Sequence, residues 1–272
     1  MPPASKLPVG IVGAGHLGLS LARILVAHGW RKGDLRIAHR GSERSLRALA
    51  DQGWTDWTAP AAEVARCQVV FLTVRPTDLG TLDLLFPAAT TVISCLAGCE
   101  TPQLEAVLRH RVVRVLPSSP SSLEGGIGIA ALFPRDPEVE ALVASLGISV
   151  FPLATEAEFP AFTACLCLPA ALLERERRGD SRPDIGALKS IIVPFSTSDR
   201  LLAWALSSTP VGLTDAGRED YITRMMTPGG VTEAMVLALR QGADLGGSFT
   251  RGMERSQELA RGSTIAPTVS QN

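Results

Sequence analysis

The sequence predicts an α/β fold in two parts: a doubly wound, mostly parallel sheet at the N-terminus, followed by an all-helical domain. Short apolar runs alternate with helical patterns up to about residue 154, which is typical of a parallel sheet with crossover helices. After that point only helical periodicity remains. We therefore expect a sheet domain over 1–154 and a helical domain over 155–272, with a flexible Ser/Thr/Pro-rich tail at 262–272.

The first apolar run, Val9 to Val12, leads into a glycine-rich turn and an amphipathic helix. Three glycines have the G-x-G-x-x-G spacing that opens a dinucleotide-binding βαβ unit of a Rossmann-like fold. The first permits a tight turn, the second admits a pyrophosphate close to the backbone, and the third lets helix and strand pack closely. The N–H groups at the helix start would hold the diphosphate. The loop residues predicted to bind the cofactor are Gly13, Gly15, His16, Leu17 and Gly18.

The end of the second predicted strand indicates which dinucleotide binds. An NAD site usually places an acidic side chain there, to hold the ribose 2′-hydroxyl. This chain has His39, Arg40, Ser42 and Arg44 instead, which suit the extra negative charge of a 2′-phosphate. Glu43 is the one residue in this stretch that opposes the preference. We predict NADP, with NADPH preferred over NADH.

Two further strand ends should face the same cofactor. A continuous apolar run over 68–74 is typical of a strand buried on both faces, and the next strand and its turn are expected over 91–98. Ligands of open α/β sheets bind at the carboxyl ends of the strands. The residues predicted to bind the cofactor there are Val74, Arg75, Pro76, Ala97 and Gly98.

The remaining elements follow from the same patterns. Further strands are expected over 111–116, 128–133 and 148–153, and helices of the first domain include one beginning at a capping Thr101. The charged stretch 175–184 is interpreted as a solvated loop. Helices of the second domain are predicted over 161–176, 184–195, 198–208, 218–226 and 231–261.

Composition excludes several classes of function. A net charge of −1 gives no electrostatic reason to bind nucleic acid, and no run reaches the roughly 18 uninterrupted apolar residues of a membrane span. The start, MPPASKLPVG, lacks the apolar region of a signal peptide, so we expect a cytoplasmic protein. Five cysteines without C-x-x-C spacing and four histidines without ligand spacing predict no metal site. Cys67 and Cys95 are expected to be buried and reduced.

Five motifs occur along the chain in an order that matches one known family: GAGHLG at 13–18, VRP at 74–76, ISCLAG at 93–98, VRVLPSSP at 113–120 and MTPGGVTEA at 226–234. In these motifs the chain resembles the pyrroline-5-carboxylate reductases, which reduce a cyclic imine to proline with NAD(P)H. The resemblance covers most of the chain and implies a homodimer through interlocked helical domains, with the imine bound between the nicotinamide and the partner's helices.

The last motif is the most specific. Thr227, Gly229 and Gly230 form a turn between two predicted helices, where free N–H groups could face a substrate. The resemblance places Thr232 by the imine nitrogen. A hydroxyl is a poor general acid, so we assign Thr232 a hydrogen-bonding and positioning role in catalysis. The alternative is a threonine that only caps the helix.

The chain departs from the family at two substrate-binding segments. Where the family has a Ser-Gly-Ser-Gly-Pro-Ala turn that receives the substrate carboxylate, this chain has Cys-Leu-Cys-Leu-Pro-Ala at 165–170. Ser118 stands in a segment that has also diverged. Cys165, Cys167 and Ser118 are therefore candidate residues of an altered substrate pocket, for a bulkier or carboxyl-masked cyclic imine.

Two other functions stay open. One is reduction of another acceptor, such as a carbonyl, an enamine or a deazaflavin, although the helical domain holds no histidine and a single lysine, Lys189, as a proton donor. The other is a cofactor-binding protein that has lost catalysis and acts as a sensor or partner subunit.

Overall fold

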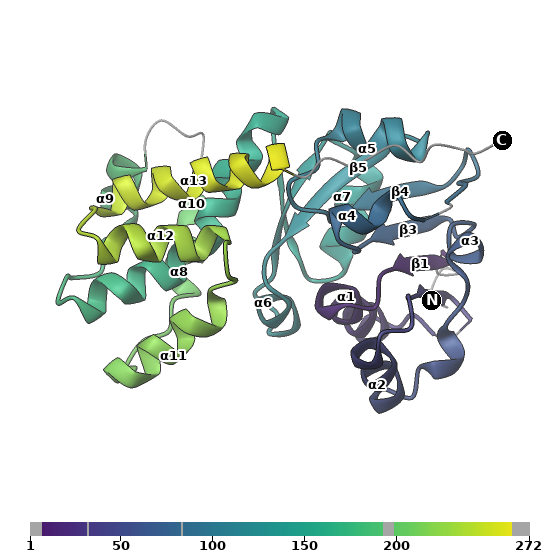
Figure 1. The fold of residues 1–272 in the computed structure, drawn as a ribbon, viewed down its shortest axis with the longest axis horizontal. Helices are drawn as coiled ribbons and strands as arrows, with labels where there is room; N and C mark the ends of the chain where they lie inside the picture. The colour runs from purple at the N-terminus through teal and green to yellow at the C-terminus, as the bar shows by residue number, and fades with distance from the viewer. Residues whose placement is uncertain (1–6, 32, 83, 193–198, 263–272) are drawn as a thin grey trace. The chain divides into compact units, whose positions relative to one another are not determined.

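The computed structural model describes residues 7–31, 33–82, 84–192 and 199–262 (Figure 1). The chain divides into two compact units, one ending at Glu156 and one spanning Ala157–Gly262. The predicted tail beyond Gly262, and the facing ends of the helices predicted over 184–195 and 198–208, lie outside the described residues.

The first unit is built on a sheet of seven strands within the described ranges, in the order β2-β1-β3-β4-β5-β6-β7. Neighbouring strands are parallel except for β5 and β6, which are antiparallel. The predicted doubly wound, mostly parallel fold is confirmed. The strands are β1 (Val9–Val12), β2 (Leu35–Ala38), β3 (Val69–Leu72), β4 (Thr91–Ser94), β5 (Val112–Pro117), β6 (Ile129–Phe133) and β7 (Ser149–Pro152).

Alternate residues of the central strands enter two separate hydrophobic clusters. In β3, Val69 and Phe71 pack into one cluster, while Val70 and Leu72 pack into the other. This burial on both faces explains the continuous apolar run at this strand. The helices of this unit are α1 (His16–Ala27), α2 (Glu43–Asp51), α3 (Ala61–Val64), α4 (Pro76–Leu79), α5 (Thr101–Leu108), α6 (Pro120–Glu124) and α7 (Pro137–Ser145), with 3₁₀ turns at Thr55–Trp57 and, at the junction of the units, Glu156–Glu158.

The second unit packs its helices around α8, which contacts α10, α11, α12 and α13. Among the residues described, α8 is the one helix long and apolar enough to cross a membrane, yet 67% of its apolar window is buried inside the protein. That burial is what the central helix of a helical unit requires. The helices are α8 (Phe159–Arg177), α9 (Ile185–Ile191), α10 (Asp199–Ser207), α11 (Asp215–Met225), α12 (Val231–Arg240) and α13 (Leu245–Gly262).

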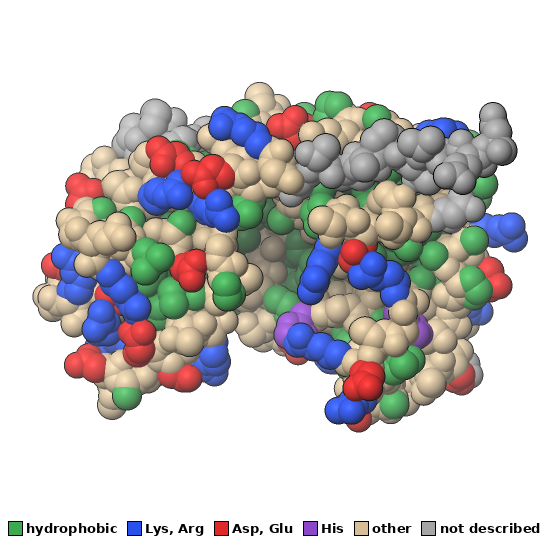
Figure 2. Space-filling model, in the orientation of Figure 1, with side chains coloured by type: hydrophobic (Ala, Val, Ile, Leu, Met, Phe, Trp, Pro, Cys, Tyr) green, Lys and Arg blue, Asp and Glu red, His purple; other side chains and the backbone are tan. Residues whose placement is uncertain are grey.

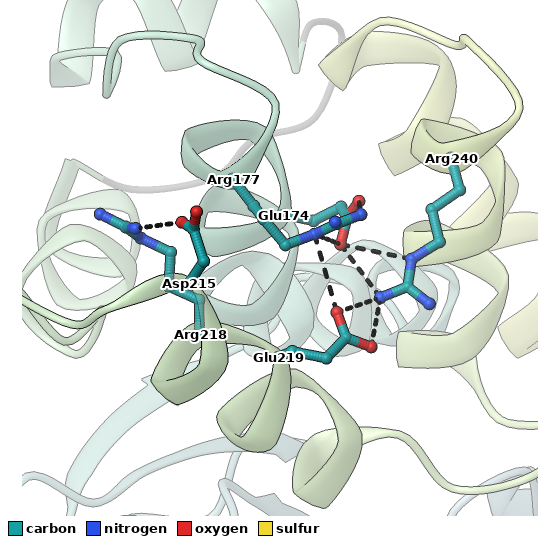
Figure 3. Close-up of polar contacts among 6 residues, drawn as sticks. All are labelled: Glu174, Arg177, Asp215, Arg218, Glu219 and Arg240. Carbon is teal, nitrogen blue, oxygen red and sulfur yellow. Dashed lines mark hydrogen bonds and ion pairs between the residues drawn. The ribbon is translucent and has the colours of Figure 1, made fainter.

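An ion network around one buried carboxylate joins three of these helices (Figure 3). The Glu174 carboxylate of α8 is fully buried and accepts hydrogen bonds from Arg177, at 2.7 Å, and from Arg240 of α12, at 3.1 Å. Glu219 of α11 binds Arg240 in turn, at 2.8 Å. Burial acts to raise the pKa of Glu174, but the hydrogen bonds from Arg177 and Arg240 outweigh it and hold the pKa below its ordinary value.

The helix predicted over 161–176 is confirmed as α8, and the segment 165–168 lies inside it rather than in the turn of the family pattern. Three other local expectations are corrected by the structure. The predicted helix over 231–261 is two helices, separated at Gly242, whose φ of +99° suits only glycine. Glu100, not Thr101, caps α5, through a capping box with Gln103. The charged stretch 175–184 begins within α8, and its Arg182 is held by Glu176 and by two backbone carbonyls.

Candidate functional site

The glycine loop after β1 is tightly packed at two glycines and open at the third. A Cβ added to Gly18 would lie 1.9 Å from the carbonyl oxygen of Gly13, so α1 and the loop touch backbone to backbone. Gly13 has a φ of +118°, and its carbonyl oxygen accepts a hydrogen bond from the Thr73 hydroxyl at 2.8 Å. A Cβ at Gly15 would meet nothing within 4 Å. The cradle therefore has room for a ligand at Gly15, as a dinucleotide diphosphate requires.

The start of α1 provides the donors for such a ligand. Gly15 is the N-cap residue and makes no side-chain capping hydrogen bond, and no acidic residue occupies the first turn. The first N–H groups of the helix therefore have no side-chain partner, and the helix dipole makes this end positive. A phosphate oxygen fits this place without rearrangement of the chain.

The loop after β2 is tied to the glycine loop. Ser42 caps α2, accepting a hydrogen bond from the Ser45 backbone N–H, and the Ser45 hydroxyl donates to the Ala14 carbonyl oxygen at 3.0 Å. The two loops are thus held side by side at the carboxyl ends of β1 and β2, where Val12 and Ala38 pair.

Basic side chains gather at this edge of the sheet, over α1, α2 and α4 (Figure 2). The Arg44 guanidinium contacts Nε2 of His16, and Arg40 forms an ion pair of 2.7 Å with Asp78 of α4. Glu43, which opposed an NADP preference in the sequence, is directed along α2 to Arg47 at 3.4 Å. The structure thus brings the predicted 2′-phosphate residues together around the glycine loop, together with Asp78, which sequence reasoning missed.

The other predicted cofactor residues lie at the same sheet edge. The register pairs Val12 with Leu72 and Leu72 with Ser94, so the segments after β1, β3 and β4 leave the sheet together. Of these residues, Arg75 and Ala97 are exposed, and Val74 and Pro76 are half-buried. Arg75 is the N-cap residue of α4, and Gly98 has a φ of +74°.

Ser118 uses both its backbone and its side chain in hydrogen bonds to the neighbouring strand β6. It is buried, its N–H donates to the Ile129 carbonyl oxygen, and its hydroxyl oxygen accepts from the Ile129 N–H at 3.2 Å. Its side chain closes the ladder between β5 and β6, so the geometry of this unit gives no support to a substrate contact.

In the helical unit the structure brings Thr232 and Cys167 together. Thr232 is the second residue of α12, and its hydroxyl donates to the Sγ of Cys167 on α8 at 3.2 Å. The N-cap of α12 is Gly230, which has no side-chain cap. The alternative that Thr232 only caps the helix is therefore wrong, because its hydroxyl is directed at the neighbouring helix.

The Thr-Pro-Gly-Gly turn is held more firmly than the sequence indicated. The Gly229 N–H donates to Glu233 at 2.7 Å, its carbonyl oxygen accepts from Arg255 at 2.8 Å, and the Gly230 N–H donates to the Thr227 carbonyl oxygen at 2.8 Å. Two N–H groups expected to be free thus have partners. Glu233 and Arg255 were missed, although a glutamate in the first turn of a helix is a known capping signal.

The two cysteines of the divergent segment are neutral thiols in the interior. Cys165 is fully buried and Cys167 nearly so. Burial raises the pKa of Cys165, and it raises the pKa of Cys167 to about 11 against a smaller, opposing effect of the Thr232 hydrogen bond. Cys165 faces the core, so its predicted substrate contact gains no support. All five cysteines are free and buried, and the described part of the chain contains no cluster of three or more His, Cys, Asp or Glu that could hold a metal ion.

Known proteins are similar to both units of this chain. Residues 8–98 match the family described as NADP oxidoreductase, coenzyme F420-dependent. A pyrroline-5-carboxylate reductase from Corynebacterium melassecola is 25% identical over 276 residues, covering 93% of this chain and 98% of that protein.

Solved structures show the same fold. A pyrroline-5-carboxylate reductase from Coxiella burnetii matches with a TM-score of 0.57 at 18% identity, covering 96% of this chain and all of that one. The enzyme from Streptococcus pyogenes matches with a TM-score of 0.56 at 20% identity, covering 94% and 100%. The Plasmodium falciparum reductase, solved with NADP bound, matches at 0.54 and 16%, covering 93% and 98%.

The open glycine cradle, the sheet topology and these similarities define an NAD(P)-dependent oxidoreductase with a Rossmann-like domain. Within that class the chain is similar to pyrroline-5-carboxylate reductases over most of its length, so the resemblance predicted from its motifs is confirmed.

Proposed function

We propose that this protein is an NADPH-dependent reductase that transfers hydride to the carbon of a cyclic C=N bond. The observation that carries the proposal is the cradle at Gly15, open at the start of α1 and flanked by Arg40 and Arg44. The similarity to the pyrroline-5-carboxylate reductase from Corynebacterium melassecola, over 98% of that protein's length, supports a cyclic imine as the hydride acceptor.

The chain's own residues hold and orient the reactants. The N–H groups of the first turn of α1 would hold the diphosphate, and Arg40, Arg44 and His39 the 2′-phosphate. Bound NADPH supplies the hydride. Thr232 Oγ1 would accept a hydrogen bond from the N–H of the protonated imine, while its own proton stays directed at the Sγ of Cys167. Since a protonated imine carbon is already electrophilic, orientation is the main requirement.

We propose further that the substrate differs from pyrroline-5-carboxylate. Residues 165–168 lie inside α8, so their N–H groups serve the helix, and none of the four carries a hydroxyl. Pro169 in the same helix has no N–H at all. A carboxylate placed here would forgo charge-assisted hydrogen bonds of about 1.5–3 kcal/mol each, which favours an uncharged or carboxyl-masked imine.

The partner and compartment proposals rest on the resemblance. We propose a cytoplasmic homodimer that pairs through the helical unit, which exposes Val211, Leu237 and Leu259. Light scattering coupled to size exclusion should give about twice the 28.7 kDa chain mass; a monomer at micromolar concentration would contradict the dimer.

The test is NADPH oxidation, followed by absorbance, with a panel of imines. The panel contains pyrroline-5-carboxylate, its methyl ester, 1-pyrroline and a six-membered imine carboxylate, with NADH in parallel. Turnover confined to the uncharged imines supports both proposals. Rates on the free acid that are ordinary for a metabolic enzyme would contradict the altered substrate but not imine reduction.

A second candidate acceptor is a deazaflavin, favoured by the family match over residues 8–98. The assay is oxidation of NADPH by an oxidised deazaflavin, or reduction of NADP⁺ by the reduced form. Turnover here without turnover of any imine would replace the main proposal. NADPH binding without reaction in either assay would favour a non-catalytic cofactor-binding protein.

A further inference from the structure

One acidic side chain stands among the basic groups at the edge of the sheet that we assign to the cofactor. Asp78 of α4 follows β3, while Arg40 follows β2, and the two meet in an ion pair of 2.7 Å between Oδ2 and Nη2. The Asp78 side chain is 18% exposed and that of Arg40 is 59% exposed, so Asp78 is the better-fixed partner. The pair therefore fixes the guanidinium at the place where a 2′-phosphate is expected.

We propose that Asp78 sets the cofactor preference by competing with the 2′-phosphate for Arg40. This inference rests on the proposed NADPH site. A guanidinium that is paired with a carboxylate must give up that partner, or share it, when a phosphate binds. Asp78 thus lowers the affinity for NADPH and leaves the affinity for NADH, which has no charge at this position, almost unchanged.

The neighbouring charges make Asp78 the one carboxylate able to act in this way among the residues described at this edge. Glu43, the first residue of α2, binds Arg47 on its own helix. Arg44 contacts a histidine rather than a carboxylate. Removal of the Asp78 charge should consequently free Arg40 without disturbing the rest of the loop.

The experiment compares binding of 2′,5′-ADP with 5′-AMP, and of NADP⁺ with NAD⁺, by titration calorimetry. These probes differ only in the 2′-phosphate, and binding needs no knowledge of the substrate. Asp78→Asn should tighten 2′,5′-ADP and NADP⁺ by about fivefold, the effect of one exposed ion pair, and leave 5′-AMP and NAD⁺ within about twofold. In an Arg40→Gln background the same substitution should give no gain.

Asp51→Asn is the matched control, since it removes one exposed negative charge at the end of α2 in the same unit. An equal gain for NAD⁺ and NADP⁺, a gain that survives in Arg40→Gln, or an equal gain in Asp51→Asn would each overturn the inference. A protein that binds NADP⁺ in this pattern but reduces no imine would refute the proposed function and leave the inference standing. A protein that binds neither dinucleotide would refute both.

Discussion

Gly18 is the position in the glycine loop where one added carbon should disturb the fold most. In Gly18→Ala the new Cβ would lie 1.9 Å from the Gly13 carbonyl oxygen and 2.7 Å from the Thr73 hydroxyl, whereas real Cβ contacts essentially never fall below 3.0 Å. The backbone of the loop or of α1 must therefore move by roughly 1 Å in a closely packed region. Overpacking of this kind costs about 1–3 kcal/mol.

Gly15→Ala is the informative comparison. Gly15 has a φ of −83°, which alanine adopts freely, and its added Cβ would meet nothing within 4 Å. The free energy of unfolding should stay within about 0.5 kcal/mol of the wild type. The methyl group would occupy the space reserved for the pyrophosphate, so NADP⁺ binding should weaken about tenfold or more.

Thermal unfolding and NADP⁺ titration of both variants give the result. Gly18→Ala should lower the melting temperature by about 2–12 °C, from a cost of about 1–3 kcal/mol and 2–4 °C for each kcal/mol in a chain of this size. Gly15→Ala should unfold at the wild-type temperature and bind poorly. If Gly15→Ala bound NADP⁺ as tightly as the wild type, the assignment of the open cradle to the diphosphate would be refuted.

Three further predictions concern the rest of the chain. Glu174→Ala should lower the free energy of unfolding at pH 7, measured in urea, by about 1.5–3 kcal/mol, because Arg177 and Arg240 lose charge-assisted hydrogen bonds to a buried carboxylate. The exposed substitution Glu43→Gln should change it by less than about 0.5 kcal/mol. The folded pKa of Glu174 lies below the ordinary 4.5, so the stability that the ionised carboxylate contributes is present above pH 4.5 and is lost as the pH falls through the folded pKa. The free energies of unfolding of the wild type and Glu174→Ala should therefore converge in acid. A difference that stays constant with pH would contradict the charge argument. Thr232→Val removes the hydroxyl and should lower kcat at least tenfold, with an unchanged dissociation constant for NADP⁺. Thr232→Ser keeps the hydroxyl and should retain most of the rate. Equal losses of kcat in both variants would point to packing of Thr232 against α8 instead. A disulfide reagent should label none of the five buried thiols in the native protein at pH 7 and all five in urea, and fast labelling of even one thiol in the native state would contradict the burial.

The sequence alone determined the glycine loop of the site, because that loop is built by the backbone of one short segment. The spacing of Gly13, Gly15 and Gly18 predicted the cradle, because each glycine answers a requirement of a single strand-turn-helix unit. The alternation of apolar runs likewise predicted the doubly wound sheet, since strands buried on both faces must be apolar throughout.

Helical periodicity likewise predicted the central helix over 161–176, which the structure shows as α8. Because leucines replace the family's glycines in the segment 165–168, that segment stays inside the helix. Local sequence failed over 231–261, which is predicted as one helix but forms two, because the break depends on one glycine with a positive φ.

The tertiary structure alone decided which side chains meet. Asp78 and Arg40 are 38 residues apart, and Thr232 and Cys167 are 65 apart, so neither pair has a signature in sequence spacing. Glu174 stands next to the charged stretch 175–184 in sequence, yet it is fully buried, and α12 and α11 bring Arg240 and Glu219 to it. Hydrophobic pattern and glycine spacing determine which elements form, whereas the partners of polar side chains depend on helix packing that no local pattern encodes.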